Sequence, residues 1–150
     1  MAWVAFSCDE FCEEPNRTAV VINFYSSESD AIRVSNVAIT GVGNDSVLYS
    51  KSNYSQVMLP VNPSADSMRF SIEYNDLPAD TIIIHYVRYN GFISSECGCV
   101  TFAELQEVEI EGATERTDHA IVQLEVTKPH VSTVSYRQGV INEENIRIYY

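Results

Sequence analysis

Alternation of apolar and polar residues with a period of two is the feature of this sequence that most constrains its fold. In "SMRFSIEY", residues 67–74, every second residue is apolar, namely Met68, Phe70, Ile72 and Tyr74. Successive side chains of a β-strand point to opposite faces of a sheet, so this pattern predicts a strand with one buried face. Segments that alternate in the same way, or that are apolar on both faces, cover residues 18–25, 31–40, 56–61, 81–89, 119–126, 131–136 and 145–150.

Turn residues separate these segments, and no long amphipathic helix recurs between them. "GVGND" at 41–45 and "NDLPAD" at 75–80 contain the Gly, Asn, Asp and Pro residues that tight turns favour. A parallel sheet would require helices between its strands. We therefore predict an all-β fold, an antiparallel β-sandwich of Ig-like or related type with about eight or nine short strands. Pro60 and Pro63 indicate an edge position for the strand at 56–61, because proline donates no hydrogen bond to a neighbouring strand.

Two segments depart from regular alternation. Near Asn36 the apolar residues change from even to odd positions, which predicts a β-bulge or a twist. The segment 99–112 fits two strand pieces joined by a kink, and we favour that interpretation. The alternative is a helix of about one or two turns, because Phe102, Leu105 and Val108 would share one helical face.

Length and charge bound the class of protein. The chain has 150 residues, 45% of them hydrophobic, which is typical of a single globular domain. It contains 21 acidic residues against 9 Lys and Arg, so its formal net charge is −12. A chain of this charge repels phosphate backbones and anionic lipid, so we expect no nucleic-acid partner. We expect residues 12–150 to form one β-sandwich domain.

The first residues, "MAWVAFSC", resemble the end of a bacterial lipoprotein signal, in which small residues precede the cysteine that receives lipid. We therefore expect that the sequence begins partway through an export signal. On this interpretation residues 1–11 are residual signal and tether, and Cys8 is the lipidation site. The alternative is a cytosolic chain with an ordinary apolar N-terminus. The sequence has no apolar run of the roughly 18 residues needed to cross a bilayer, so we expect membrane attachment only through the lipid anchor.

The four cysteines fall into two close pairs, Cys8 with Cys12 and Cys97 with Cys99. Their spacings fit a structural zinc site poorly, because zinc-binding hairpins favour about two residues between paired ligands. A disulfide from Cys12 to Cys97 or Cys99 would close a loop of about 85 residues and contribute up to about 4 kcal/mol. With Cys8 assigned to lipid, we predict that Cys12 pairs with Cys97, with Cys99 as the alternative partner, and we predict no metal or cofactor site.

The histidines and carboxylates do not form a recognisable catalytic motif. His85 lies inside an apolar strand and is interpreted as a core or cross-strand residue, whereas His119 and His130 are expected at the surface. Neither a Gly-x-Ser-x-Gly nor a His-Glu-x-x-His motif occurs. We therefore predict no catalytic residue and a protein that is not an enzyme.

Two surface features bear on binding. Glu107, Glu109 and Glu111 would line one exposed face of a strand, which protects an outer strand from pairing with other chains. Most tyrosines of β proteins pack within their sheets, but an exposed cluster would indicate a sugar-binding platform. The tyrosines in question are Tyr25, Tyr49, Tyr54, Tyr74, Tyr86, Tyr89, Tyr149 and Tyr150, and Trp3 is the single tryptophan.

A further set of motifs extends along nearly the whole chain: Cys8, Cys12, Pro15, "VVINFY", "MLPVN", "ADTIIIHYVRY" and Cys97-Gly98. In these motifs the chain resembles an uncharacterised family of small lipoproteins from Bacteroides-type bacteria, a domain of unknown function. The resemblance implies an envelope location and an Ig-like or related sandwich, and it supplies no catalytic residue.

We expect a cell-envelope lipoprotein module with a non-catalytic binding or structural role. Its expected location is the outer membrane, facing the periplasm or the cell surface, and its partner an unknown envelope protein or glycan. The alternative function is a carbohydrate-binding module of a surface glycan system, and a third class would be an envelope enzyme with a deep polar pocket.

Overall fold

The computed structural model describes residues 17–43, 47–62, 64–74, 78–94, 98–111, 121, 123–131, 133–134 and 144–150. All regular elements in this part of the chain are strands, which confirms the all-β prediction. They are β1 (Arg17–Tyr25), β2 (Val34–Gly41), β3 (Val47–Tyr54), β4 (Gln56–Pro60), β5 (Ser67–Glu73), β6 (Asp80–Ser94), β7 (Gly98–Ile110), β8 (Gln123–Val126), β9 (His130–Val131), β10 (Thr133–Val134) and β11 (Ile146–Tyr149). The described residues include no helix that is long and apolar enough to cross a membrane.

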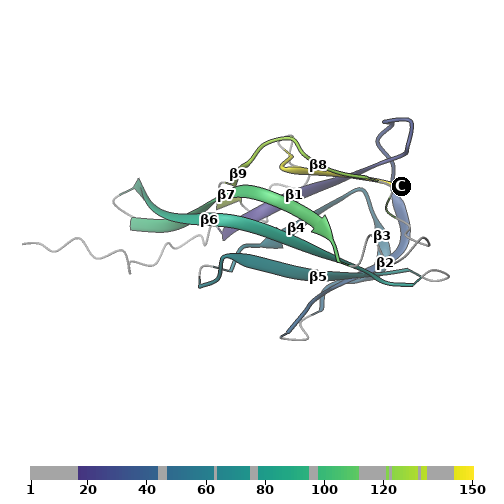
Figure 1. The fold of residues 1–150 in the computed structure, drawn as a ribbon, viewed down its shortest axis with the longest axis horizontal. Coiled ribbons are helices and arrows are strands. Elements are labelled where there is room, and N and C mark those ends of the chain that lie inside the picture. Colours follow the sequence, from purple (N-terminus) through teal and green to yellow (C-terminus); the bar gives the residue numbers. More distant parts are fainter. Residues whose placement is uncertain are drawn as a thin grey trace, which may run out of the picture.

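The strands form two sheets around one hydrophobic core, as a β-sandwich requires (Figure 1). The six-stranded sheet has the order β3-β2-β5-β6-β7-β9, and every neighbouring pair in it is antiparallel. Its longest strands, β6 and β7, form the curved hairpin drawn in teal and green in Figure 1. The predicted sandwich is thereby confirmed, with two of its strands, β9 and β10, only two residues long.

The five-stranded sheet is built around β1. Ile22 of β1 pairs with Val57 of β4 and also with Ile146 of β11, so β4 and β11 lie on opposite sides of β1. The pairing of β1 with β11 is parallel, whereas the sequence predicted an antiparallel sandwich. A parallel pair is possible here because no tight turn joins the two strands; almost the whole chain lies between them. Among the described residues β4 pairs with β1 alone, so the predicted edge strand is confirmed.

The core consists of inward-facing side chains from both sheets. Val20, Ile22 and Phe24 of β1 are at most 1% exposed and belong to the same cluster as Ile82 and Ile84 of β6. These residues alternate along their strands with residues of the outer faces, as period-two patterning demands. The core therefore holds the N-terminal strand against the middle of the chain.

The predicted irregularity at Asn36 is a β-bulge in β2. Val34 pairs with Tyr54 and Val37 pairs with Ser52, so two residues of β2 lie opposite one residue of β3. Asn36 adopts a φ of 56°, a left-handed conformation that asparagine tolerates better than most residues. The bulge moves the apolar side chains of β2 from even to odd positions.

A second bulge explains the ambiguous segment 99–112. Residues 99–110 of the segment belong to a single strand, β7, whose bulge is the predicted kink, so the helical alternative is wrong for these residues. His85 of β6 pairs with Glu107 and Tyr86 pairs with Leu105, which leaves Gln106 as the additional residue. The bulge keeps Leu105 and Val108 on the core side although they are three positions apart. Their helix-like spacing is therefore a consequence of the bulge.

Candidate functional site

The cysteines predicted to carry lipid and a disulfide lie where the structure gives no description of their side chains. Cys8, Cys12 and Cys97 lie outside the described residues, as do the predicted tether and His119. Cys99 belongs to β7, where its backbone pairs with that of Phe92. Lipidation at Cys8 and the Cys12–Cys97 bridge therefore stay predictions.

A row of polar side chains crosses the outer face of the five-stranded sheet. Gln56, Asn23, Arg147 and Glu125 occupy register positions on β4, β1, β11 and β8. Neighbouring residues in such a row have their Cβ atoms about 5 Å apart, so their side chains can interact directly. The amide of Gln56 donates to Asn23 Oδ1 at 2.7 Å, which joins β4 to β1 on this face.

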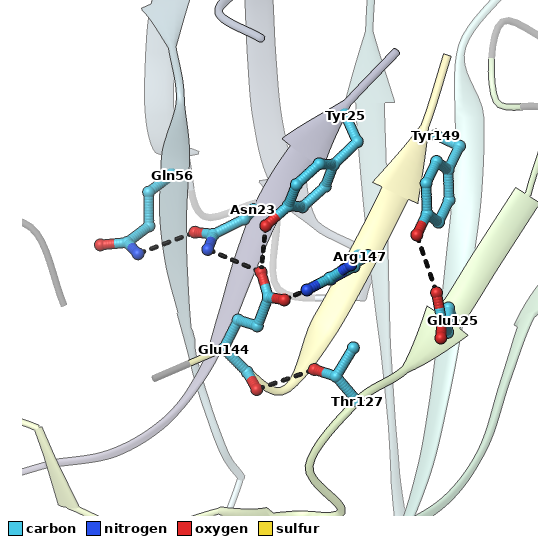
Figure 2. Close-up of polar contacts among 8 residues, drawn as sticks. All are labelled: Asn23, Tyr25, Gln56, Glu125, Thr127, Glu144, Arg147 and Tyr149. Carbon is cyan, nitrogen blue, oxygen red and sulfur yellow. Dashed lines mark hydrogen bonds and ion pairs between the residues drawn. The ribbon is translucent and has the colours of Figure 1, made fainter. Parts of the chain in front are cut away.

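The carboxylate of Glu144 is the centre of this face, as Figure 2 shows. Glu144 precedes β11 and its side chain is 11% exposed. Its Oε2 accepts hydrogen bonds from Tyr25 Oη at 2.7 Å and from Asn23 Nδ2 at 2.8 Å. Its Oε1 accepts a hydrogen bond from Arg147 Nε. The Glu144 carboxylate thus connects the segment that precedes β11 to side chains of both β1 and β11.

Aromatic contacts extend the same cluster. The Arg147 guanidinium lies 4.7 Å from the centre of the Tyr25 ring, an arrangement in which the ring attracts the cation. The Tyr25 and Tyr149 rings lie 5.7 Å apart, and Tyr149 Oη donates to Glu125 Oε2 at 2.8 Å (Figure 2). The cluster therefore spans β1, β11 and β8.

The hydrogen bonds at Glu144 determine its protonation. Burial by itself raises the pKa of Glu144, but the hydrogen bonds from Tyr25, Arg147 and Asn23 outweigh burial and lower the pKa below its ordinary value. Burial, together with Glu144, raises the pKa of Tyr25, so the phenol keeps its proton and donates it. Because donors already surround the Glu144 carboxylate, we interpret its role as structural: it holds β1 and β11 together.

The lowered pKa of Glu144 predicts that acid weakens the fold. A carboxyl whose folded-state pKa is depressed contributes stability above its ordinary pKa of 4.5, and this contribution is lost as the pH falls through the folded-state value. Glu144→Gln is expected to lower the free energy of unfolding by about 1 kcal/mol at neutral pH and to flatten its decline below pH 4.5. Urea unfolding at a series of pH values measures both effects.

Tyr25→Phe is the matched variant, since it removes one donor and leaves the carboxylate in place. It is expected to change the acid dependence in the same direction and by less. A Glu144→Gln variant that declines in acid as steeply as the wild type would contradict the assignment.

Asn145 lies beside this cluster and is 7% exposed. Its Oδ1 accepts a hydrogen bond from the Val21 N–H at 2.9 Å. Its Nδ2 donates to the carbonyls of Lys128 at 3.0 Å and His130 at 2.9 Å. Its main-chain N–H donates to the Val21 carbonyl at 2.9 Å. The residue therefore joins β1 to the turn between β8 and β9, and sequence reasoning did not identify it.

A second surface lies on the outer face of the six-stranded sheet. It consists of Val87, Tyr89, Phe102, Glu104 and His130, and we call it the aromatic surface. Register places these residues together: Tyr89 pairs with Phe102, Val87 with Glu104, and Glu104 with His130. Val87 is 48% exposed and Tyr89 is 41% exposed, and both are prominent among the exposed large apolar residues of the described chain.

The three rings of the aromatic surface contact one another. Their centres are 5.6 Å apart for Tyr89 and Phe102, 5.9 Å for Phe102 and His130, and 6.0 Å for Tyr89 and His130. The interplanar angles of the same three pairs are 25°, 25° and 33°, in that order. Tyr89 Oη lies 2.7 Å from His130 Nδ1, a hydrogen-bond distance. His130 is thus exposed, as predicted, and lies beside Tyr89.

Ion pairs continue this face toward the other end of the sheet. His85 Nε2 lies 3.3 Å from Glu109 Oε1, so the cross-strand interpretation of His85 is confirmed. Arg69 of β5 lies 3.3 Å from Glu111 Oε1. Glu107, Glu109 and Glu111 are all exposed, as the sequence predicted. Glutamates therefore outnumber the basic side chains described on this part of the face.

The other tyrosines in the described part of the chain pack within the fold, as expected for β proteins. Tyr86 and Tyr149 are buried, and the rings of Tyr49 and Tyr54 meet edge to face. Tyr74 Oη donates to Tyr150 Oη at 3.2 Å near the buried Asp80, and burial raises the pKa of both phenols. Among the described tyrosines, Tyr89 fits the predicted exposed aromatic position.

A cavity of about 450 Å³ opens near the start of β5 and the end of β4. Its volume is in the range of small-molecule sites. Its lining combines core side chains with polar groups: Val42, Leu48, Val61, Asn62, Met68, Arg69 and Phe70. The described lining contains a single charged residue, Arg69, whose guanidinium pairs with Glu111.

Comparison with known proteins adds one finding. A family model described as a family of unknown function, DUF6452, matches residues 36–150. No curated protein and no solved structure matches the chain. The matched part begins within β2, so β1 precedes it, although β1 pairs with three strands of the matched part. The chain belongs to DUF6452, a family of unknown function.

Proposed function

We propose that this protein is a lipid-anchored module of the cell envelope that binds a partner and has no catalytic role. The small residues before Cys8 support the anchor, and the acidic chain is suited to a soluble module outside the bilayer. The polar cluster at Glu144 supports a structural use of its carboxylate, because donors from β1 and β11 already engage both oxygens.

The observation that carries the binding role is the aromatic surface. A protein that acts alone rarely leaves apolar and aromatic side chains together in water, and such patches are typical of binding sites. Val87 and Tyr89 are exposed side by side with Glu104 and His130, and the long β6–β7 hairpin holds them in register. Because paired strands already hold these side chains in register, binding here requires little ordering of the backbone.

The envelope location is tested in the native host by cell fractionation and by mass spectrometry of the N-terminal peptide. We expect membrane-fraction protein with lipid on Cys8, and loss of membrane attachment in Cys8→Ser. An unmodified Cys8 in a cytosolic protein would contradict the proposal.

Carbohydrate binding is the second candidate, and the aromatic surface favours it specifically. Sugar rings present flat C–H faces that pack on aromatic rings, while their hydroxyl groups hydrogen-bond to carboxylate and imidazole groups. Tyr89, Glu104 and His130 supply all three kinds of group within one patch.

A glycan array with purified protein tests this candidate, and Tyr89→Ala is the decisive variant. We expect a signal for the wild-type protein and about a fivefold loss of affinity in Tyr89→Ala, because aromatic stacking contributes about 1 kcal/mol. The variant is expected to change the free energy of unfolding by less than about 1 kcal/mol, since Tyr89 is exposed. Absence of any glycan signal would remove the carbohydrate candidate.

A further inference from the structure

The ring contacts of the aromatic surface define a flat platform. Phe102 lies on β7, between Tyr89 on β6 and His130 next to β7 on β9. Tyr89 Oη and His130 Nδ1 are 2.7 Å apart, so the two side chains extend toward each other over β7, the strand between them. Phe102 is accordingly half-buried, although it lies on the outer face of the sheet. The Tyr89 and His130 rings therefore meet at their edges, and the Phe102 ring lies close to both at a small interplanar angle.

The charge beside this platform is negative. Glu104 Oε2 lies 3.7 Å from His130 Nδ1, and the Glu104 side chain is 49% exposed. Glu107 follows on the same face of β7 and is also exposed. Besides His130, the basic side chains described on this face include Arg69 and His85, which already lie against Glu111 and Glu109. An anionic ligand on the platform would meet like charges that destabilise it.

We infer that the aromatic surface selects saccharides that carry free amino groups, an inference that rests on the carbohydrate candidate above. The sugar ring packs on the Tyr89–His130 platform, and its protonated amine lies against the Glu104 carboxylate. Acidic glycans are excluded by Glu104 and Glu107. Neutral glycans keep the ring contact and lack the ion pair, so they bind more weakly.

Isothermal titration calorimetry of the full chain tests this inference with three probes: a short glucosamine oligomer, its N-acetylated counterpart and an oligogalacturonate. Titrations are run at mildly acidic pH, where sugar amines carry charge. We expect the glucosamine oligomer to bind about fivefold tighter than the N-acetylated one, the size expected for a partly exposed ion pair. The oligogalacturonate is expected to show no binding.

Two variants separate ring contact from charge. Glu104→Gln is expected to abolish the preference for the amine and to retain binding of the N-acetylated oligomer. Glu73→Gln makes the same charge change at an exposed position of β5 outside the aromatic surface and is expected to keep the preference. This control distinguishes an ion pair at Glu104 from general attraction to an acidic protein.

The outcomes distinguish this inference from the proposed function. If none of the three saccharides binds, and the array is also blank, the carbohydrate candidate fails and this inference fails with it. If amine and N-acetyl oligomers bind equally, or if Glu104→Gln keeps the preference, the inference is overturned while carbohydrate binding stands. Tightest binding of the oligogalacturonate would overturn the inference in the same way.

Discussion

Phe24→Ala is expected to lower the free energy of unfolding by about 3–5 kcal/mol, a large part of the stability of a domain of this size. Phe24 is 1% exposed, and its ring lies 5.8 Å from that of Tyr150. Truncation removes the ring from the core and leaves a cavity that the packed sheets fill only partly. Urea unfolding followed by circular dichroism measures the loss.

Phe24→Leu and Tyr25→Phe are the matched controls. Phe24→Leu retains most of the buried volume and is expected to lose less than about 2 kcal/mol. Tyr25→Phe changes the neighbouring residue on the opposite face and is expected to lose about 1 kcal/mol with its hydrogen bond to Glu144. A small loss in Phe24→Ala would mean that β1 contributes little to the core. That result would contradict the structure, in which this strand precedes the family-matched residues 36–150 yet lies at the centre of a sheet.

Asn145→Ala is expected to lower the free energy of unfolding by about 3 kcal/mol. The alanine side chain cannot replace the acceptor for the Val21 N–H or the donors for the Lys128 and His130 carbonyls. The bond lengths are ordinary and the residue is buried, so water does not readily substitute for the lost partners. The same urea titration measures this loss.

Asn62→Ala is the control for Asn145→Ala. Asn62 is exposed, and its Oδ1 accepts a hydrogen bond from the nearby Ser64 N–H at 2.9 Å. Its replacement is expected to change the free energy of unfolding by about 0.5 kcal/mol or less. Equal losses in the two variants would show that Asn145 does not have the connecting role assigned to it.

Local patterning was sufficient to predict most strands. Met68, Phe70 and Ile72 are buried in β5 as their alternation indicated, because the faces of a strand depend only on neighbouring residues. The parity change at Asn36 correctly indicated a bulge. In β7 the same kind of bulge gave Leu105 and Val108 a helical spacing, so periodicity alone could not exclude a helix there.

The candidate sites were less predictable, because each one joins residues that are distant in the chain. Val21 and Asn145 are 124 positions apart, and no local pattern indicates that they meet. Glu144, which engages Tyr25 and Arg147, was one acidic residue among 21 in the sequence. Tyr89 was predicted in an apolar strand and His130 at the surface after a turn, but their contact depends on β9 pairing with β7.

The sequence by itself determined that the chain forms strands, which residues of those strands face the core, and where two strands deform. These properties follow from the period of two, from turn residues and from the φ preferences of single residues. Only the tertiary structure decided that β1 runs parallel to β11, that Glu144 and Asn145 connect them, and that Tyr89 and His130 form one surface. Those features depend on sheet order, which is set by the combined burial and hydrogen bonding of the whole chain.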